Sequence, residues 1–183
     1  YRKEKESLSD FLAKHFPEKE EWEESVFVGG KGERKAWITP SQVNYVARVG
    51  SFLDKALPYT GALKVMKNAL TFDFLWKNIR EKGNAYGIMS GFGRSGESYV
   101  VSYRDPHVGR TYEVYKKIAD YLCNFEATEL EMTKYIIGAS SEMDTPKPAY
   151  TKFLLGLSCT LSHLTTEDLQ KERDEVLSAS PET

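Results

Sequence analysis

The sequence contains few of the residues and segments that disulfide scaffolds, zinc ribbons and membrane proteins require. Its two cysteines, Cys123 and Cys159, lie far apart in 183 residues, and neither belongs to a C-x-x-C pair. Disulfide scaffolds and zinc ribbons therefore lack support. No run of about 18 apolar residues is present to span a membrane, and no charged-then-apolar signal peptide opens the chain. We expect no membrane partner, and we expect both cysteines to be buried apolar thiols.

The sequence also lacks an excess of charge of either sign. Its 25 basic and 27 acidic residues leave a net charge of -2, without the basic face that nucleic acids normally demand, so we expect no nucleic-acid partner. A content of 40% hydrophobic and 13% aromatic residues suits a single globular domain over residues 1–183 with a sizeable core. The chain opens on Tyr1 rather than Met, which indicates a fragment of a longer polypeptide and leaves the compartment of that polypeptide open.

The histidines do not form a recognisable metal motif. His15, His107 and His163 have no second histidine at helical or turn spacing, and neither H-E-x-x-H nor H-x-x-E-H occurs, so a zincin-type site is not expected. The serine-nucleophile pattern G-x-S-x-G is also absent. Cys159 and His163 are one helical turn apart in an apolar segment, which fits a core cysteine beside a surface histidine. The chain alone does not look like a complete enzyme.

Residues 91–96 read GFGRSG, which matches the nucleotide-binding pattern G-x-G-x-x-G. In a dinucleotide site those glycines follow a strand and open a helix. Here residues 85–92 alternate as a strand does, and residues 97–103, ESYVVSY, are rich in β-branched and aromatic residues. The pattern therefore predicts a β-hairpin rather than a phosphate site. Its turn contains Gly93, Arg94, Ser95 and Gly96.

The first half of the chain combines predicted strands with one long helix. An amphipathic helix over residues 1–16 ends before Pro17, and two or three strands follow within residues 26–50. Residues 61–83 have apolar positions on two helical faces, which is typical of a buried helix. Gly83 is the expected C-terminal cap of this helix, and Arg80 and Lys82 suit its last turn.

The second half is predicted to be helical after the hairpin. Helices are expected over residues 104–125, 128–144, 147–164 and 165–180, the last opening at Thr166 with Glu167 and Asp168 in its first turn. Strands, a helix, a hairpin and then helices predict an α+β fold. Its sheet is mostly antiparallel with helices packed on one face, and its C-terminal part is helical.

Individual side chains carry further expectations. Trp22, Trp37 and Trp76 are interpreted as core or interdomain packing. Arg104 and Asp105, which precede Pro106, are interpreted as a salt bridge in a turn.

Residues 75–87, LWKNIREKGNAYG, place Arg80 and Tyr86 near one another where a buried helix passes into a strand. A guanidinium offers several hydrogen-bond donors and a phenol one more, which suits the binding of peptide carbonyls or an oxyanion. Alternatively, Arg80 caps helix carbonyls and Tyr86 packs on the sheet. The residues alone leave both interpretations open.

Beyond these local patterns, most of the chain after about residue 36 resembles the last domain of the insulinase/pitrilysin-type zinc metallopeptidases, most closely their presequence-protease branch. Four segments are similar to successive parts of that domain: TPSQVNYVARVG, GALKVMKNALTFDFLWKNIREKGNAYG, SYVVSYRDPHVGRTYEVYKKIADYL and TTEDLQKERDEVLSASPE. The spacing of Arg80 and Tyr86 in REKGNAYG is the most specific element. Asn84 stands where the family more often has glycine.

The resemblance implies a clamshell peptidase with a zinc-bearing N-terminal half and a metal-free C-terminal half, of which this chain is a part. It implies no cofactor in this chain and zinc in the N-terminal half of the full-length protein. The implied partners are that half and a peptide substrate. Arg80 and Tyr86 match the family's pair that contacts the substrate, where they would anchor its backbone and stabilise developing negative charge.

Two other functions remain open beside this one. The chain could be a structural or docking module without a substrate role, or a stand-alone peptide-binding domain. If upstream residues contribute edge strands, the isolated chain would expose an unpaired sheet edge and form a dimer.

Overall fold

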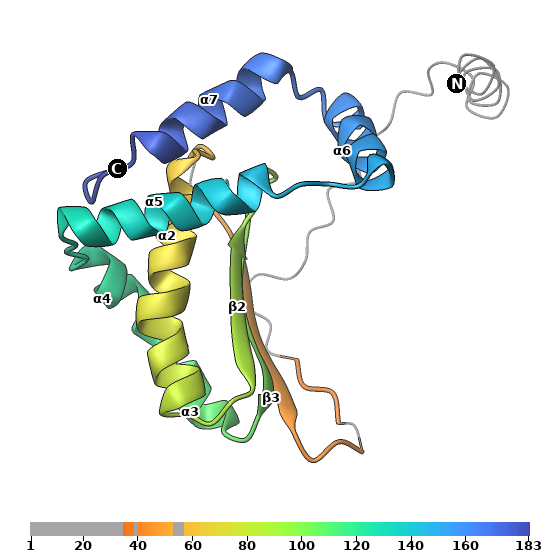
Figure 1. Cartoon of the computed structure of the whole chain (residues 1–183). Coiled ribbons are helices and arrows are strands. Elements are labelled where there is room, and N and C mark those ends of the chain that lie inside the picture. The colour runs from red at the N-terminus through yellow and green to blue at the C-terminus, as the bar shows by residue number, and fades with distance from the viewer. Residues whose placement is uncertain (1–34, 39, 53–56) are drawn as a thin grey trace, which may run out of the picture. The chain divides into compact units, whose positions relative to one another are not determined.

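The computed structural model describes residues 35–38, 40–52 and 57–183 (Figure 1). The chain divides into two compact units, Tyr1–Pro40 and Ser41–Thr183, and the helices and strands described below all lie in the second. The predicted helix over residues 1–16, together with His15 and Trp22, lies outside the described residues. The single domain over residues 1–183 stays a prediction.

In the described part of the chain, three antiparallel strands form the sheet. They lie in the order β1 (Asn44–Ser51), β3 (Glu97–Asp105) and β2 (Gly87–Phe92). The predicted hairpin is confirmed, because β2 and β3 pair in antiparallel register along the whole of β2. Within residues 26–50, where two or three strands were expected, the described part of the chain forms only β1.

Helices cover one face of this sheet, as the α+β prediction requires. The predicted helix over residues 61–83 consists of α2 (Ala62–Ala69), which continues without a break into the π-helical η2 (Leu70–Glu81). Both segments contact β2, and α3 (Val108–Lys116) contacts β1 and β3. In Figure 1 these helices stand along the same side of the strands.

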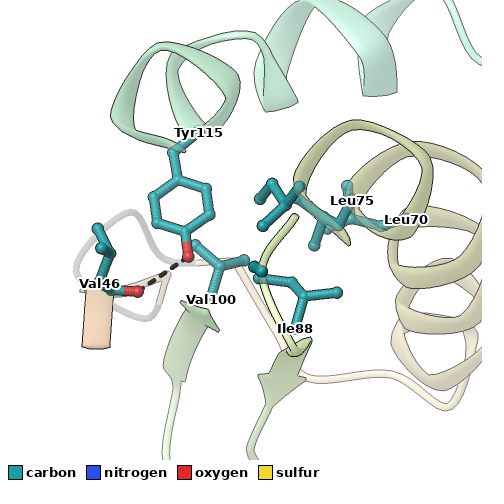
Figure 2. Close-up of a cluster of buried hydrophobic side chains, with 8 residues drawn as sticks. Val46, Leu70, Leu75, Ile88, Val100 and Tyr115 are labelled. Atoms are coloured by element: carbon teal, nitrogen blue, oxygen red, sulfur yellow. Dashed lines mark hydrogen bonds between the residues drawn. The ribbon is translucent and has the colours of Figure 1, made fainter. Parts of the chain in front are cut away.

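The main core lies between the helices and the inner face of the sheet (Figure 2). Alternating strand residues supply one side of it, namely Val46, Ile88 and Val100, while Leu70 and Leu75 supply the other. Its remaining buried members are Ile79, Ala85 and Tyr115. The Tyr115 hydroxyl donates to the carbonyl of Val46 at 2.9 Å, which satisfies a polar group inside an apolar core. Burial raises the pKa of Tyr115 to about 12.

The end of the long helix differs from the prediction by one residue. The left-handed residue is Asn84, with φ of 60°, whereas Gly83 has no positive φ. Asn is the residue after glycine that tolerates this conformation best. Gly83 is needed for another reason, because a Cβ there would collide with the carbonyl oxygen of Ile79. Asn84 thus has the left-handed conformation expected of a cap glycine, and Gly83 allows the close approach of the backbone.

The C-terminal part is helical, as predicted, with one helix divided in two. The expected helix over residues 104–125 begins only at Val108 and is interrupted at Lys117, which separates α3 from α4 (Ile118–Cys123). The other helices are α5 (Glu129–Asp144), α6 (Ala149–Leu161) and α7 (Thr166–Leu177). Thr128 and Thr165 each form a capping box, at the starts of α5 and α7. The cap of α7 is therefore one residue before Thr166.

A second, smaller core joins α2, α5 and α7. Val65, Met132, Ala139 and Val176 are its buried members. In contrast, α6 has no buried residue in the structure, although its sequence is the most apolar of the helices. Five of its exposed apolar side chains recur at helical spacing along one stripe: Tyr150, Phe153, Leu154, Leu157 and Leu161.

Two side-chain predictions are corrected. Arg104 and Asp105 do not form a salt bridge, because the Asp105 carboxylate is buried and accepts hydrogen bonds from Ser102 and Thr111. The cysteines are not fully buried, since Cys123 is exposed and Cys159 is half-buried. Trp76 packs partly against the main core as expected, whereas Trp37 is exposed and its interdomain packing stays a prediction.

Candidate functional site

Arg80 and Tyr86 lie together at the junction between η2 and β2. The Arg80 Nε donates to the backbone carbonyl of Tyr86 at 3.0 Å, and the left-handed Asn84 between them reverses the chain. The Arg80 guanidinium also lies over the ring of Trp76, with its Cζ 4.2 Å from the ring centroid. The predicted proximity of the two residues is confirmed.

This contact differs from the helix-capping interpretation, because the carbonyl that Arg80 binds belongs to Tyr86 and not to the helix. Arg80 does hold a backbone carbonyl, but it uses only Nε for that bond. Its two terminal nitrogens make no hydrogen bond or ion pair within residues 35–38, 40–52 and 57–183. The Nε–H of Arg80 therefore has a structural role, and the fork formed by the two terminal nitrogens remains available to another molecule.

Tyr86 is not packed into the sheet. Its side chain is 62% exposed, and its ring stands beside that of Tyr103 at 5.6 Å between centroids. The Arg104 guanidinium lies over the Tyr86 ring, with its Cζ 5.5 Å from the ring centroid. The phenol hydroxyl has no hydrogen-bond partner among the described residues, so it too is an available donor.

The sheet face next to Tyr86 is apolar and aromatic, and no helix of the described chain covers it. Cross-strand rows place Tyr45 beside Tyr103, and Val49 beside Tyr99. On β2 these two rows continue as Gly87 and Gly91, and Met89 lies between them opposite Val101. A Cβ at Gly87 or Gly91 would collide with the ring of Tyr103 or Tyr99, so these tyrosines lie flat over the β2 backbone. The outer face is thus a shallow tyrosine-rich surface that ends at Tyr86 and Arg80.

The glycine-rich turn lies at the opposite end of the hairpin and does not belong to this site. Gly96, with φ of 85°, donates to the carbonyl of Gly93 at 3.0 Å and closes the turn. Arg94 in this turn forms an ion pair with Glu172 of α7. The motif therefore builds the predicted hairpin and anchors a helix.

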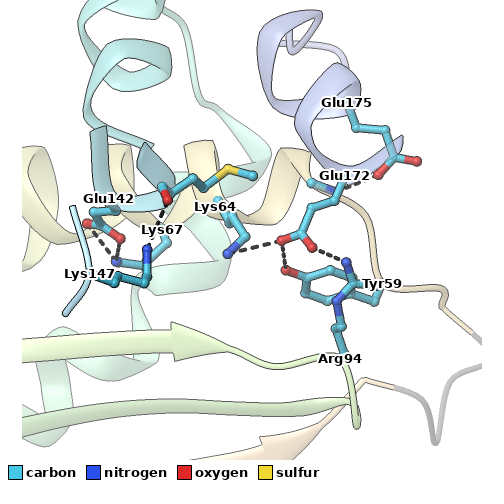
Figure 3. A network of polar contacts seen from close by, with 10 residues as sticks. Tyr59, Lys64, Lys67, Arg94, Glu142, Lys147, Glu172 and Glu175 are labelled. Atoms are coloured by element: carbon cyan, nitrogen blue, oxygen red, sulfur yellow. Dashed lines mark hydrogen bonds and ion pairs between the residues drawn. The ribbon is translucent and has the colours of Figure 1, made fainter. Parts of the chain in front are cut away.

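Glu172 is the centre of a polar network that the sequence did not reveal (Figure 3). Its side chain is only 7% exposed, and its Oε1 accepts from the Tyr59 hydroxyl at 2.9 Å and from Lys64 Nζ at 3.0 Å. Burial acts to raise the pKa of Glu172, but the hydrogen bonds from Lys64 and Tyr59 outweigh it and hold that pKa below its usual range. One turn later, Glu175 accepts from the backbone N–H of Gly61 at 2.7 Å and so caps α2.

The described residues do not fit a zinc ion. No group of three His, Cys, Asp or Glu side chains comes together within them, and zinc sites need three or four such ligands. Cys159 and His163 lie at the end of α6 without a third ligand. In the same part of the chain, no helix is long and apolar enough to cross a membrane.

Comparisons with known proteins support a relationship over most of the chain. The family described as "PreP C-terminal domain" matches residues 34–183. Protein HypA of Clostridium perfringens is 42% identical over 182 residues, which is 100% of this chain and 19% of that protein. Presequence protease 1 of Arabidopsis thaliana, chloroplastic/mitochondrial, is 32% identical over 150 residues, or 80% of this chain and 14% of that protein.

A solved structure supports the fold. The peptidase M16 inactive domain from Pseudomonas fluorescens aligns with a TM-score of 0.54 and 19% sequence identity, over 75% of this chain and 35% of that chain. The chain spans about a fifth or less of the length of the curated relatives named above. Their activities therefore belong to much longer polypeptides.

Proposed function

The chain belongs to the PreP C-terminal domain family, and from that premise we propose that it is a metal-free domain that closes the substrate chamber of a longer zinc metalloendopeptidase. In this role it contacts the peptide through Arg80 and Tyr86. The relatives that support the proposal are named presequence proteases and are several times longer than this chain. The zinc ion would be held by the N-terminal half of the full-length protein.

The observation that carries the proposal is the pairing of two available donors at one point. The Arg80 Nε fixes the Tyr86 backbone, which leaves the guanidinium fork and the phenol hydroxyl exposed beside each other. No described carboxylate neutralises the Arg80 guanidinium. A scaffold without a substrate role has no need of this exposed arrangement.

The chemistry of the two residues suits a peptide backbone. The guanidinium fork of Arg80 would donate to an oxygen acceptor of the substrate, and the Tyr86 hydroxyl would donate to the oxygen on which negative charge develops. The tyrosine-rich sheet face next to them offers a surface over which an extended peptide can lie. The chain therefore orients the peptide and supplies donors, and the described residues bring no metal to the reaction.

The proposal is tested by mixing this chain with the zinc-bearing half and measuring peptide hydrolysis. Each part is also measured alone. We expect activity only in the mixture, and a loss of about 100-fold with Tyr86→Phe or Arg80→Ala, which is the effect of losing an oxyanion donor. Matched controls are Tyr150→Phe on α6 and Arg110→Ala on α3, both exposed. Full activity with both site variants would remove the substrate role.

A structural or docking module remains the alternative function, and the apolar stripe of α6 favours it. Six large apolar side chains on this helix are exposed, five of them along the stripe, more than a helix in water normally presents. If docking is the whole function, charged substitutions on α6 abolish association with the N-terminal half, and the Arg80 and Tyr86 variants leave its activity unchanged. A stand-alone peptide-binding domain would instead bind peptides without the other half.

A further inference from the structure

Arg104 occupies a β-bulge in a conformation that disfavours its side chain. In the pairing of β1 with β3, Asn44 faces Asp105 and Tyr45 faces Tyr103, so Arg104 is an extra residue without a partner on β1. Its φ is 49°, in the left-handed region. Glycine is the usual residue at such a position, and a long side chain there is an outlier.

The bulge explains the backbone of Arg104 but not its side chain. It turns the next residue, Asp105, into the interior, where the carboxylate is only 1% exposed. There Oδ2 accepts from the hydroxyls of Ser102 and Thr111, both at 2.6 Å, and Oδ1 accepts from the N–H of His107 at 2.8 Å. Glycine or asparagine would allow the same bulge at lower cost. A strained residue of unexpected type is a reason to look for a function of its side chain.

The side chain of Arg104 points to the site of Arg80 and Tyr86. Its Cζ lies 5.5 Å from the centroid of the Tyr86 ring, whose backbone carbonyl is held by Arg80. Arg104 has no ion pair with any described carboxylate, because the neighbouring Asp105 is turned inward. Tyr86 is therefore accompanied by two guanidinium groups whose positive charge the described residues do not neutralise.

We propose that Arg104 is a specificity-determining residue of this site and that, together with Arg80, it binds a carboxylate group of the peptide. The proposal rests on the proposed function, since it names the chemistry that the Arg80 and Tyr86 site prefers. Two guanidinium forks without acidic partners favour an anion over a neutral carbonyl, and a carboxylate matches the geometry of the fork. The carboxylate can belong to the C-terminus of the peptide or to an acidic side chain.

The test is an NMR titration of the 183-residue chain with three forms of one short peptide, followed through the Nε–H signals of its arginines. The first form has a free C-terminus and no acidic residue. The second is its C-terminal amide, and the third is that amide with one glutamate. We expect the first or the third form to bind at least about fivefold more tightly than the second, as one exposed ion pair allows. The form that binds identifies the source of the carboxylate.

The variants Arg104→Gln and Arg104→Lys assign this preference to Arg104. We expect Arg104→Gln to abolish the preference, Arg104→Lys to keep part of it, and the control Arg110→Gln to leave it unchanged. Equal binding of all three peptides, or no binding of any, would overturn the proposal. Neither result contradicts the proposed function, which the mixing experiment tests separately. There, unchanged hydrolysis with the Arg80 and Tyr86 variants is the outcome that contradicts it.

The variant Arg104→Gly distinguishes a binding role from a structural one. Glycine suits φ of 49°, so the melting temperature should rise by about 3 °C, while the preference for the carboxylate is lost. If Arg104 served the fold alone, its removal would lower the melting temperature and leave peptide binding as it was. That result would also overturn the proposal.

Discussion

Arg94, at the tip of the hairpin between β2 and β3, forms an ion pair with Glu172 in the C-terminal helix α7, 78 residues later in the chain. The Arg94 guanidinium also lies over the ring of Tyr59, 5.0 Å from its centroid, and Tyr59 donates to the same carboxylate. One buried acid thus connects the hairpin, the segment before α2, and α7. This network and the buried Val176 together hold α7 in place.

We expect Glu172→Ala to lower the free energy of unfolding by about 2 kcal/mol. Removing this carboxylate leaves Tyr59, Lys64 and Arg94 without their acceptor, and breaking a buried pair is costly, although the part-exposed cations reduce the effect. The control is Arg173→Ala, which breaks the exposed pair of Arg173 with Asp144 and should cost less than about 0.5 kcal/mol. Urea denaturation measures both values. Equal losses for the two variants would show that the Glu172 network is no more than a surface contact.

The same network predicts a dependence of stability on pH. The folded-state pKa of Glu172 lies below the ordinary value of 4.5, so the folded state favours the ionised form more than the unfolded state does. The stabilisation is therefore present in full above the unfolded pKa, and it is lost as the pH falls through the folded pKa. Melting temperatures of the wild type and Glu172→Gln should differ most at neutral pH and converge as the pH falls below the ordinary value of 4.5. A difference that is constant between pH 7 and pH 3 contradicts this account.

The exposed stripe of α6 predicts that a substitution on this helix leaves the stability of the chain almost unchanged. Leu157 on its exposed stripe contributes nothing to either core, so Leu157→Lys should change the free energy of unfolding by less than about 0.5 kcal/mol. Leu75, which is fully buried in the main core, is the matched comparison. Leu75→Ala should cost about 2–5 kcal/mol, because it leaves a cavity. A large loss with Leu157→Lys would mean that α6 packs within the isolated chain.

The sequence predicted the features that depend on local signals. Strand alternation on both sides of GFGRSG predicted the hairpin, and the helical periodicity up to Gly83 predicted the long buried helix. The short distance along the chain from Arg80 to Tyr86 then brought the two residues together. The role of these two residues stays a prediction, because proximity and exposure are compatible with binding but do not demonstrate it.

Features that depend on distant partners had no signal in the sequence. Glu172 looks like an ordinary surface residue of an amphipathic helix, and its partners Arg94 and Tyr59 are 78 and 113 residues away. Asp105 appeared to be one half of a turn salt bridge, because nothing in the order Arg104–Asp105–Pro106 reveals a bulge that turns the acid inward. The exposure of α6 could not be predicted either, since an apolar helix normally indicates burial.

The final prediction compares Gly83, at the junction that carries Arg80 and Tyr86, with Gly109 in α3. Substitution by alanine should change the free energy of unfolding in opposite directions at these two positions. A Cβ at Gly83 would collide with the Ile79 carbonyl oxygen, whereas a Cβ at Gly109 in α3 would meet nothing within 4 Å. We therefore expect Gly83→Ala to destabilise the chain by about 1–3 kcal/mol. Gly109→Ala should stabilise it by about 0.5–1 kcal/mol, because alanine favours the helix and restricts the unfolded chain.

NMR spectra of Gly83→Ala and Gly109→Ala give a second test, made at the site itself. To relieve the collision, Gly83→Ala must move the backbone between Arg80 and Tyr86, so the Arg80 Nε–H signal should shift in NMR spectra as its bond to the Tyr86 carbonyl weakens. Gly109→Ala should leave that signal in place. An unchanged Nε–H signal in a destabilised Gly83→Ala chain would mean that the helix yields instead of the junction. The geometry of the site would then be independent of the turn that precedes it.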